Sequence, residues 1–143
     1  LTVAQIESQR TYLLKGIDTF VETARLLPDI PFCIAGLDQD KLANLVKDFP
    51  ENIRIIGQVE HQQLADYFLR SKIYCQFSRS ESFGIALAEA IWSGCYPLVT
   101  QEGGMPEVVG DKKWVVRRDA VEIAGIINAL FHSAPLQVSL SEK

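Results

Sequence analysis

The 143-residue chain is long enough to bury one core of ordinary size, and its 48% hydrophobic and 22% charged residues are typical of a globular domain. Its formal charge of −4, with acidic and basic residues interspersed, lacks the clustered basic surface of a nucleic-acid-binding protein. No apolar run reaches the roughly 20 residues that cross a bilayer, and no segment resembles a signal peptide.

Strand-like and helix-like runs alternate along the chain. We expect strands at 3–7, 32–35, 53–56, 73–77, 96–99 and 114–116, and helices at 17–27, 40–47, 61–69, 82–94, 106–109 and 121–131. Strict alternation predicts an α/β fold, a Rossmann-like parallel sheet flanked by helices. In such sheets, ligands bind at the carboxyl ends of the strands, where Gly36, Gly57 and residues 78–84 and 100–104 fall.

The helix at 82–94 has features of an anion-binding site. Ser82 is a good N-cap and Gly94 a good C-terminal stop, so we expect Phe83, Gly84 and Ile85 in the first turn. Backbone N–H groups there lack intrahelical partners, and the positive end of the helix dipole favours anions. At Gly84 a phosphate could approach the backbone closely, because glycine has no side chain.

Two carboxylates accompany this helix. Glu89 is the lone acid of an apolar helix, where an unpaired buried charge is costly, so we expect it to face a polar cleft, a partner or a ligand. A salt bridge in a structural core is the alternative. We expect Glu81 in the preceding loop, because continuous helix would place the two acids about 12 Å apart. An ordinary solvated loop acid is the alternative for Glu81.

Residues 78–90 and two later segments resemble a known family. The run SRSESFGIALAEA is followed by GCYPLVT at 94–100 and GGMPEVV at 103–109. In this order they resemble the nucleotide-sugar-binding half of retaining GT-B glycosyltransferases of group 1. Arg10 and Lys15 look like the family's basic pair, and IAG at 34–36 and IIG at 55–57 look like its strand-end glycines. The resemblance covers residues 10–132.

The resemblance implies roles for individual residues. Glu89 would hold the ribose hydroxyls of the donor, and Glu81, the catalytic candidate, would contact its sugar. Groups expected to complete the donor site, chiefly around the pyrophosphate, are Arg10, Lys15, Ser82, Phe83, Gly84, Ile85, Gly103 and Gly104. Cationic side chains and backbone N–H groups suit a leaving phosphate whose negative charge grows in the transition state. We therefore expect neither a metal nor a cofactor. The alternative for Gly103 and Gly104 is that they shape a turn.

The resemblance also implies a division of the protein. Residues 1–132 would be the donor-binding domain, one half of a GT-B fold, and 133–143 a loose tail. The enzyme would transfer a sugar from a nucleotide sugar to an acceptor with retention of configuration, in glycan or polysaccharide biosynthesis. Because the chain starts without methionine, we expect a piece of a longer cytoplasmic protein whose N-terminal domain binds the acceptor and makes any peripheral membrane contact. This piece alone would catalyse little.

Other classes fit parts of the pattern. A nucleotide-sugar epimerase or a phosphorylase could use the same sheet and helix start. A noncatalytic nucleotide-binding module is a further alternative, although a receiver-like module would need an acidic cluster at a strand end, which the sequence lacks. The chain also departs from the family pattern: Gln76-Phe77 stands where a proline commonly precedes the serine, and DKKW at 111–114 replaces a glycine-containing turn.

The remaining chemically distinctive residues have ordinary explanations. Cys33, Cys75 and Cys95 lack metal-site spacing, so we expect buried, reduced thiols. His61 and His132 are expected near helix ends on the surface, without the partners of a catalytic triad. We expect Trp92 and Trp114 in the core rather than in a binding surface.

Overall fold

The computed structural model describes residues 1–42, 44–46, 48–81 and 84–133. Ser82, Phe83 and all but the first residue of the expected tail at 133–143 lie outside these residues. The elements are β1 Thr2–Val3, α1 Gln9–Leu14, α2 Ile17–Arg25, β2 Phe32–Ala35, α3 Gln39–Leu42, β3 Ile53–Ile56, α4 His61–Arg70, β4 Ile73–Gln76, α5 Ile85–Trp92, β5 Tyr96–Val99, α6 Met105–Val109, the 3₁₀ turn η1 Lys112–Trp114, and α7 Ala120–Phe131. From β2 to α6, strands and helices alternate as predicted.

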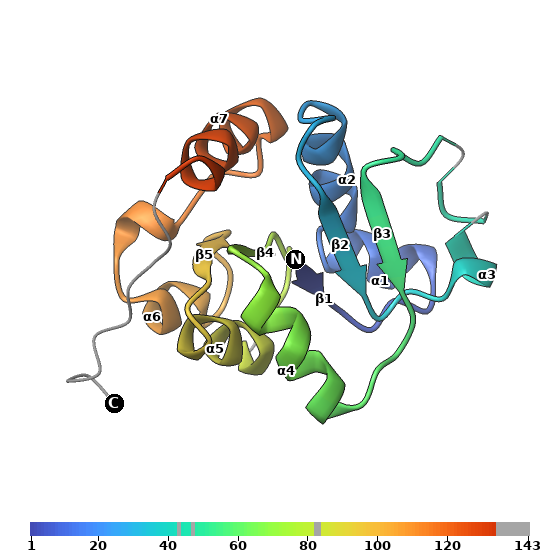
Figure 1. Ribbon diagram of the computed structural model, residues 1–143, viewed down its shortest axis with the longest axis horizontal. Helices are drawn as coiled ribbons and strands as arrows, with labels where there is room; N and C mark the ends of the chain where they lie inside the picture. Colours follow the sequence, from blue (N-terminus) through green and yellow to red (C-terminus); the bar gives the residue numbers. More distant parts are fainter. Residues whose placement is uncertain (43, 47, 82–83, 134–143) are drawn as a thin grey trace.

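All paired strands are parallel. β1, β2 and β3 form one sheet, in which Ile34 lies opposite Thr2 and Ile55, and β4 pairs with β5. Leu1 joins the two sheets, because its amino group donates to the Ile73 carbonyl at 2.9 Å and its carbonyl accepts from the Cys75 N–H at 2.8 Å. The spatial order is therefore β3-β2-β1-β4-β5 (Figure 1), and its direction reverses between β1 and β4.

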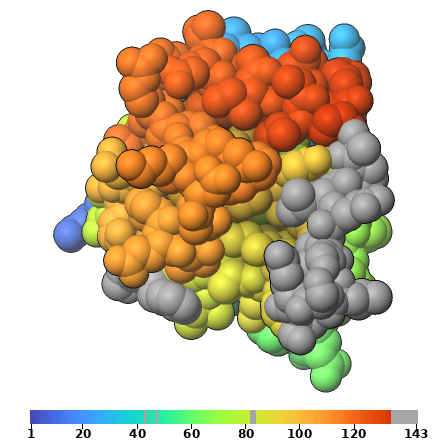
Figure 2. All heavy atoms as spheres, turned by 90° about the vertical axis from the view of Figure 1, so that its left-hand side faces the viewer, coloured from blue at the N-terminus to red at the C-terminus, as the bar shows by residue number. Residues whose placement is uncertain are grey.

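Helices cover both faces of the strands (Figure 1). Alternate residues of a strand point to opposite faces, so Ile34 and Cys75 belong to one core while Ala35 and Tyr74 belong to the other. The first core is completed by α2 and α7, and the second by α4, α5 and α6. Figure 2 shows the segment from α6 to α7 covering one side of the molecule. Burial on both faces explains the continuous apolar runs of the strands.

The first helix was not predicted. β1 ends at Val3 rather than continuing to residue 7, and α1 begins at Gln9. Ser8 caps α1 through a reciprocal pair: Ser8 Oγ accepts from the Thr11 N–H at 3.2 Å, and Thr11 Oγ1 accepts from the Ser8 N–H at 3.0 Å. This box uses threonine in place of the usual Glu or Gln, so its sequence signal is weak.

Other boundaries also differ from the prediction. The helix expected at 40–47 is restricted to α3, and the strand expected at 114–116 is replaced by η1, which Asp111 caps; only Val115 bridges to Val99. The α5 helix has an outer face that carries Ile85 and Trp92, so its predicted burial on all sides was wrong, as was the placement of Trp92 in the core. In the described part of the chain, no helix has the length and apolarity to span a membrane.

Candidate functional site

The carboxyl ends of β1 and β4 meet where the strand order reverses, which is the usual ligand site of such sheets. Here α2 begins at Gly16 and approaches the end of β4 very closely. A Cβ atom at Gly16 would lie 1.9 Å from the Phe77 carbonyl oxygen, and its φ of 68° also favours glycine. The Arg79 N–H donates to the Leu14 carbonyl at 2.7 Å. The loop after β4 is thus fixed to the α1–α2 junction.

Glu81 lies in this loop and is held by three donors. Its side chain is only 12% exposed, so the alternative of a solvated loop acid was wrong. The donors all contact one oxygen, Oε2: Lys15 Nζ at 3.1 Å, Gln76 Nε2 at 2.8 Å and Ser78 Oγ at 3.3 Å. Among the described residues, none donates to Oε1. Lys15, expected to bind phosphate, is therefore paired with the carboxylate expected to contact the sugar.

A buried tyrosine extends this arrangement into the core. The Tyr74 hydroxyl donates to Gln76 Oε1 at 3.0 Å, and Tyr74 is fully buried. Burial raises the pKa of Tyr74 far above its usual range, so the phenol stays protonated and remains a donor. A continuous path of hydrogen bonds therefore runs from Tyr74 through Gln76 to Glu81.

Residues from distant parts of the chain also hold the same loop. The Ser78 carbonyl accepts from Thr100 Oγ1 at 2.7 Å and from Arg118 Nη2 at 3.0 Å. Arg79 makes a two-pronged ion pair with Asp18 on α2, at 2.7 and 2.8 Å, and this hydrogen bonding raises the pKa of the guanidinium. The sequence contains no signal that pairs Arg118 or Asp18 with this loop, because both contacts join distant segments.

The start of α5 differs from the prediction. Gly84 is its N-cap, with φ −88°, and Ile85 is its first helical residue, so Gly84 does not lie in the first turn. The predicted N-cap Ser82 lies outside the described residues, as does Phe83. A Cβ atom at Gly84 would lie 2.9 Å from Leu87 Cβ, which means that glycine is also required for packing here. Gly94 has φ 96° directly after the helix, which confirms it as the C-terminal stop.

Glu89 lies apart from the Glu81 contacts. Its Oε1 accepts a hydrogen bond from His61 Nε2, 2.6 Å away at the start of α4. The His61 side chain is exposed, and this surface pair is not the core salt bridge considered above. Glu89 borders a cavity of 410 Å³ between α4 and α5, lined also by His61, Ala65, Phe68, Ala88, Trp92 and Ser93.

The remaining predicted site residues occupy loops and exposed positions. Gly103 has φ 55° and Gly104 is the N-cap of α6, so both shape the turn after β5. Arg10 is exposed on α1. A separate cavity of 210 Å³ opens at the carboxyl ends of β1 and β2, lined by Val3, Ala4, Gln5, Ala35, Gly36, Gln58, Val59 and Leu64. No three His, Cys, Asp or Glu side chains gather to hold a metal within the residues that the structure describes.

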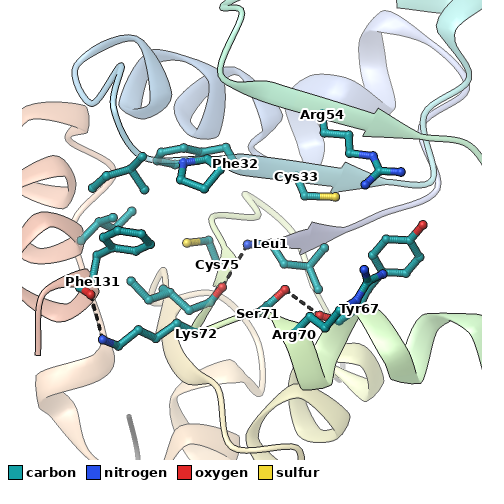
Figure 3. A pocket seen from close by; sticks show the side chains of 14 residues that line it. Leu1, Phe32, Cys33, Arg54, Tyr67, Arg70, Ser71, Lys72, Cys75 and Phe131 are labelled. Carbon is teal, nitrogen blue, oxygen red and sulfur yellow. Dashed lines mark hydrogen bonds between the residues drawn. The ribbon is translucent and has the colours of Figure 1, made fainter. Parts of the chain in front are cut away.

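Another cavity lies at the opposite edge of the sheet (Figure 3). It has a volume of 290 Å³ and opens at the amino ends of β2, β3 and β4, where Phe32, Arg54 and Ile73 line it. Arg70 lies over the Tyr67 ring at its border, and Lys72 donates to the Phe131 carbonyl at 2.8 Å. None of the predicted site residues that the structure describes lines this cavity.

The strand order, the helices on both faces and the loop at the reversal point define a Rossmann-like α/β domain of the kind found in GT-B glycosyltransferases. A solved structure with this fold, the catalytic domain of cholesterol-alpha-glucosyltransferase from Helicobacter pylori, has a TM-score of 0.73 at 18% identity, covering 92% of this chain and 86% of that one. Residues 6–143 match the family described as Glycosyl transferases group 1. The chain belongs to this family.

Relatives include two whose names specify N-acetylglucosamine. The phosphatidylinositol N-acetylglucosaminyltransferase gpi3 subunit of Schizosaccharomyces pombe is 33% identical over 120 residues, covering 76% of this chain and 25% of the relative. The UDP-N-acetylglucosamine–peptide N-acetylglucosaminyltransferase GtfA subunit of Streptococcus agalactiae is 31% identical over 98 residues, covering 66% and 19%. The chain therefore spans a quarter or less of the length of these relatives.

Proposed function

We propose that this chain is the donor-binding half of an N-acetylglucosaminyltransferase that uses UDP-N-acetylglucosamine and retains the anomeric configuration. Membership of the glycosyltransferase family supports the reaction class, and the names of the two relatives support the sugar and the nucleotide. The observation that carries the proposal is the arrangement of Glu81 at the ligand-binding edge of the sheet: a shielded carboxylate whose Oε2 is held by three donors, while no described residue donates to Oε1.

Glu81 Oε1 would accept a hydrogen bond from a hydroxyl of the donor sugar. Because its Oε2 is already held by three donors, the carboxylate needs little reorganisation when the sugar arrives. A sugar held in one orientation reacts with an effective concentration that free solution cannot supply. Glu81 thus contributes alignment of the donor.

Cationic groups would neutralise the pyrophosphate. Lys15 Nζ lies 3.1 Å from Glu81, and its flexible side chain can bridge this carboxylate and a phosphate oxygen. Arg10 supplies a second exposed cation, and the backbone at the start of α5 supplies N–H donors. Charge on the leaving phosphate grows in the transition state, so these groups lower the barrier. This chemistry assigns no role to a metal or other cofactor.

Glu89 would bind the ribose hydroxyls. A carboxylate with two acceptor oxygens suits a pair of neighbouring hydroxyls, and Glu89 borders an open cavity beside α4. The acceptor and any membrane or partner-protein contacts would be bound by a separate N-terminal domain. The chain alone is expected to bind donor without transferring sugar to an acceptor.

Calorimetric titration of the 143-residue chain tests this proposal. The probes are UDP, UDP-N-acetylglucosamine, UDP-glucose and GDP-mannose, measured under one set of conditions with and without EDTA. We expect UDP-N-acetylglucosamine to bind most tightly, UDP to bind more weakly, GDP-mannose to bind least, and EDTA to have no effect. Failure of the folded chain to bind either uridine nucleotide would overturn the proposal, and tighter binding of another sugar nucleotide would overturn the assigned donor.

A further inference from the structure

Gln76 is a buried amide that donates to Glu81. It is 7% exposed, and its bond of 2.8 Å is the shortest of the three to Glu81 Oε2. A buried amide is stable only when its donors and acceptors are satisfied. An apolar side chain could fill the same position at the end of a strand without this requirement. The amide therefore has a role that packing alone does not explain.

Tyr74 and Glu81 together orient the amide, because the Tyr74 hydroxyl is closer to Gln76 Oε1, at 3.0 Å, than to the Val3 carbonyl, at 3.5 Å. Tyr74 and Gln76 are separated by one position on β4, so both side chains extend from the same face of the strand. The Tyr74 hydroxyl donates to Gln76 Oε1, which leaves Nε2 directed at Glu81. The flipped amide would place its oxygen against the carboxylate, two acceptors facing each other, so this orientation is strongly preferred.

The other two donors fix Glu81 less firmly. Lys15 is one-third exposed and carries its charge on a flexible stem, so it attracts the carboxylate without setting its direction. Ser78 lies 3.3 Å away, a longer contact. We propose that Gln76, oriented by Tyr74, is a positioning residue that holds Glu81 Oε2 and so directs Oε1 at the donor sugar. This inference rests on the proposed sugar contact of Glu81.

Paired titrations with UDP and UDP-N-acetylglucosamine test the inference. Gln76→Leu removes the donor, and we expect affinity for the sugar nucleotide to fall roughly tenfold, while affinity for UDP stays within about twofold because UDP does not meet Glu81. Tyr74→Phe keeps the core volume and removes only the hydroxyl, so we expect a smaller loss of affinity for the sugar nucleotide. The matched controls Gln62→Leu and Tyr67→Phe, both on α4, should change neither affinity.

A double-mutant cycle separates positioning from a purely structural role. In the Glu81→Ala background, Gln76→Leu should cause no further loss of sugar-nucleotide affinity, because no carboxylate remains to be held. Equal losses for both ligands, or the full loss in the Glu81→Ala background, would overturn the positioning role. If Gln76→Leu does not fold, the same cycle with Tyr74→Phe decides. If Glu81→Ala itself leaves sugar-nucleotide affinity unchanged, the proposed function fails, and this inference fails with it.

Discussion

Glu81 and Glu89 lie in different surroundings, which separates their proposed roles. Glu81 is shielded and held through one oxygen by Lys15, Gln76 and Ser78. Within the described residues, the Glu89 carboxylate is paired with one exposed histidine beside an open cavity. The first carboxylate is preorganised for one direction of contact, whereas the second can exchange its histidine for a ligand.

Glu81→Ala is expected to separate sugar binding from nucleotide binding. The sugar loses a hydrogen bond to a charged acceptor, so affinity for UDP-N-acetylglucosamine falls roughly tenfold or more, while affinity for bare UDP changes little. Parallel calorimetric titrations measure both. Equal losses for the two ligands would show that Glu81 supports the loop structurally instead of contacting the sugar.

Glu89→Gln is expected to weaken binding of UDP itself. The amide keeps the shape of the side chain but replaces a charged acceptor, so affinity should fall roughly tenfold with the folded state intact. UDP and UDP-N-acetylglucosamine should lose affinity by similar factors, in contrast to Glu81→Ala. His61→Ala is a useful companion variant, because it removes the hydrogen-bond partner of Glu89 and keeps the carboxylate that would bind ribose. Unchanged UDP affinity in Glu89→Gln would exclude the ribose contact.

For individual residues, the sequence identifies the two carboxylates but not the side chains that form hydrogen bonds with them. Glu81 and Glu89 belong to a local motif that can be read in one segment. Arg118 and Asp18 act through contacts across tens of positions, and only the folded chain brings them to the loop. Gln76 lies five positions before Glu81, but its buried amide has no sequence signal of its own. Lys15 was predicted as a phosphate ligand, and its pairing with Glu81 depends on the α1–α2 junction, which the sequence did not predict.

Among the elements, the strands were the most predictable. The boundaries of β2, β3 and β5 agree with the prediction because buried apolar runs end where the sheet ends. The α1 helix was missed because it is short and capped by an unusual Ser–Thr box. The start of α5 was misplaced because serine at 82 is a good cap by type, whereas close packing against Leu87 requires glycine at 84.

Gly16→Ala is expected to destabilise the domain strongly. The left-handed φ of 68° costs a residue with a side chain about 1–2 kcal/mol, and the clash with the Phe77 carbonyl adds about 1–3 kcal/mol. Gly110→Ala is a matched control, because Gly110 has φ 72° and no atom within 4 Å of an added Cβ. Urea denaturation gives the free energy of unfolding of both variants, and their difference isolates the cost of the contact with the Phe77 carbonyl. Equal destabilisation would mean that α2 moves away from β4 at little cost.

Viewed as a whole, the molecule consists of two cores separated by parallel strands, with the hydrogen bonds to Glu81 at the carboxyl edge. Cys75 and Cys95 belong to opposite cores, and Cys33 packs against the second. Burial raises the pKa of Cys75 and that of Cys95 to about 11. The predicted burial of the thiols is confirmed for these two, whereas Cys33 is half-buried.

The free energy of unfolding is expected to fall as the pH rises above about 8.5. Unfolded thiols ionise near that value, while the native thiols of Cys75 and Cys95 stay protonated until about pH 11. The contribution of these two thiols to the free energy of unfolding is therefore fully present below pH 8.5 and is lost as the pH rises. Urea denaturation from pH 7 to 10 measures this decline. Cys95→Ser, which keeps a donor for the Phe68 carbonyl, should show a shallower slope, and an unchanged slope would contradict the assignment.

The hydrogen bonds that Thr100 and Arg118 donate to the Ser78 carbonyl also determine when the loop can form during synthesis of the chain. A ribosome makes the segment at 78–94 before it makes either of these residues. A nascent chain that already contains the complete glutamate motif therefore lacks two of the donors that shape its loop. Recombinant pieces that end before Arg118 would carry Glu81 and Glu89 without the Arg118 hydrogen bond to the loop. The loop can thus take its final form only after Arg118 has been made.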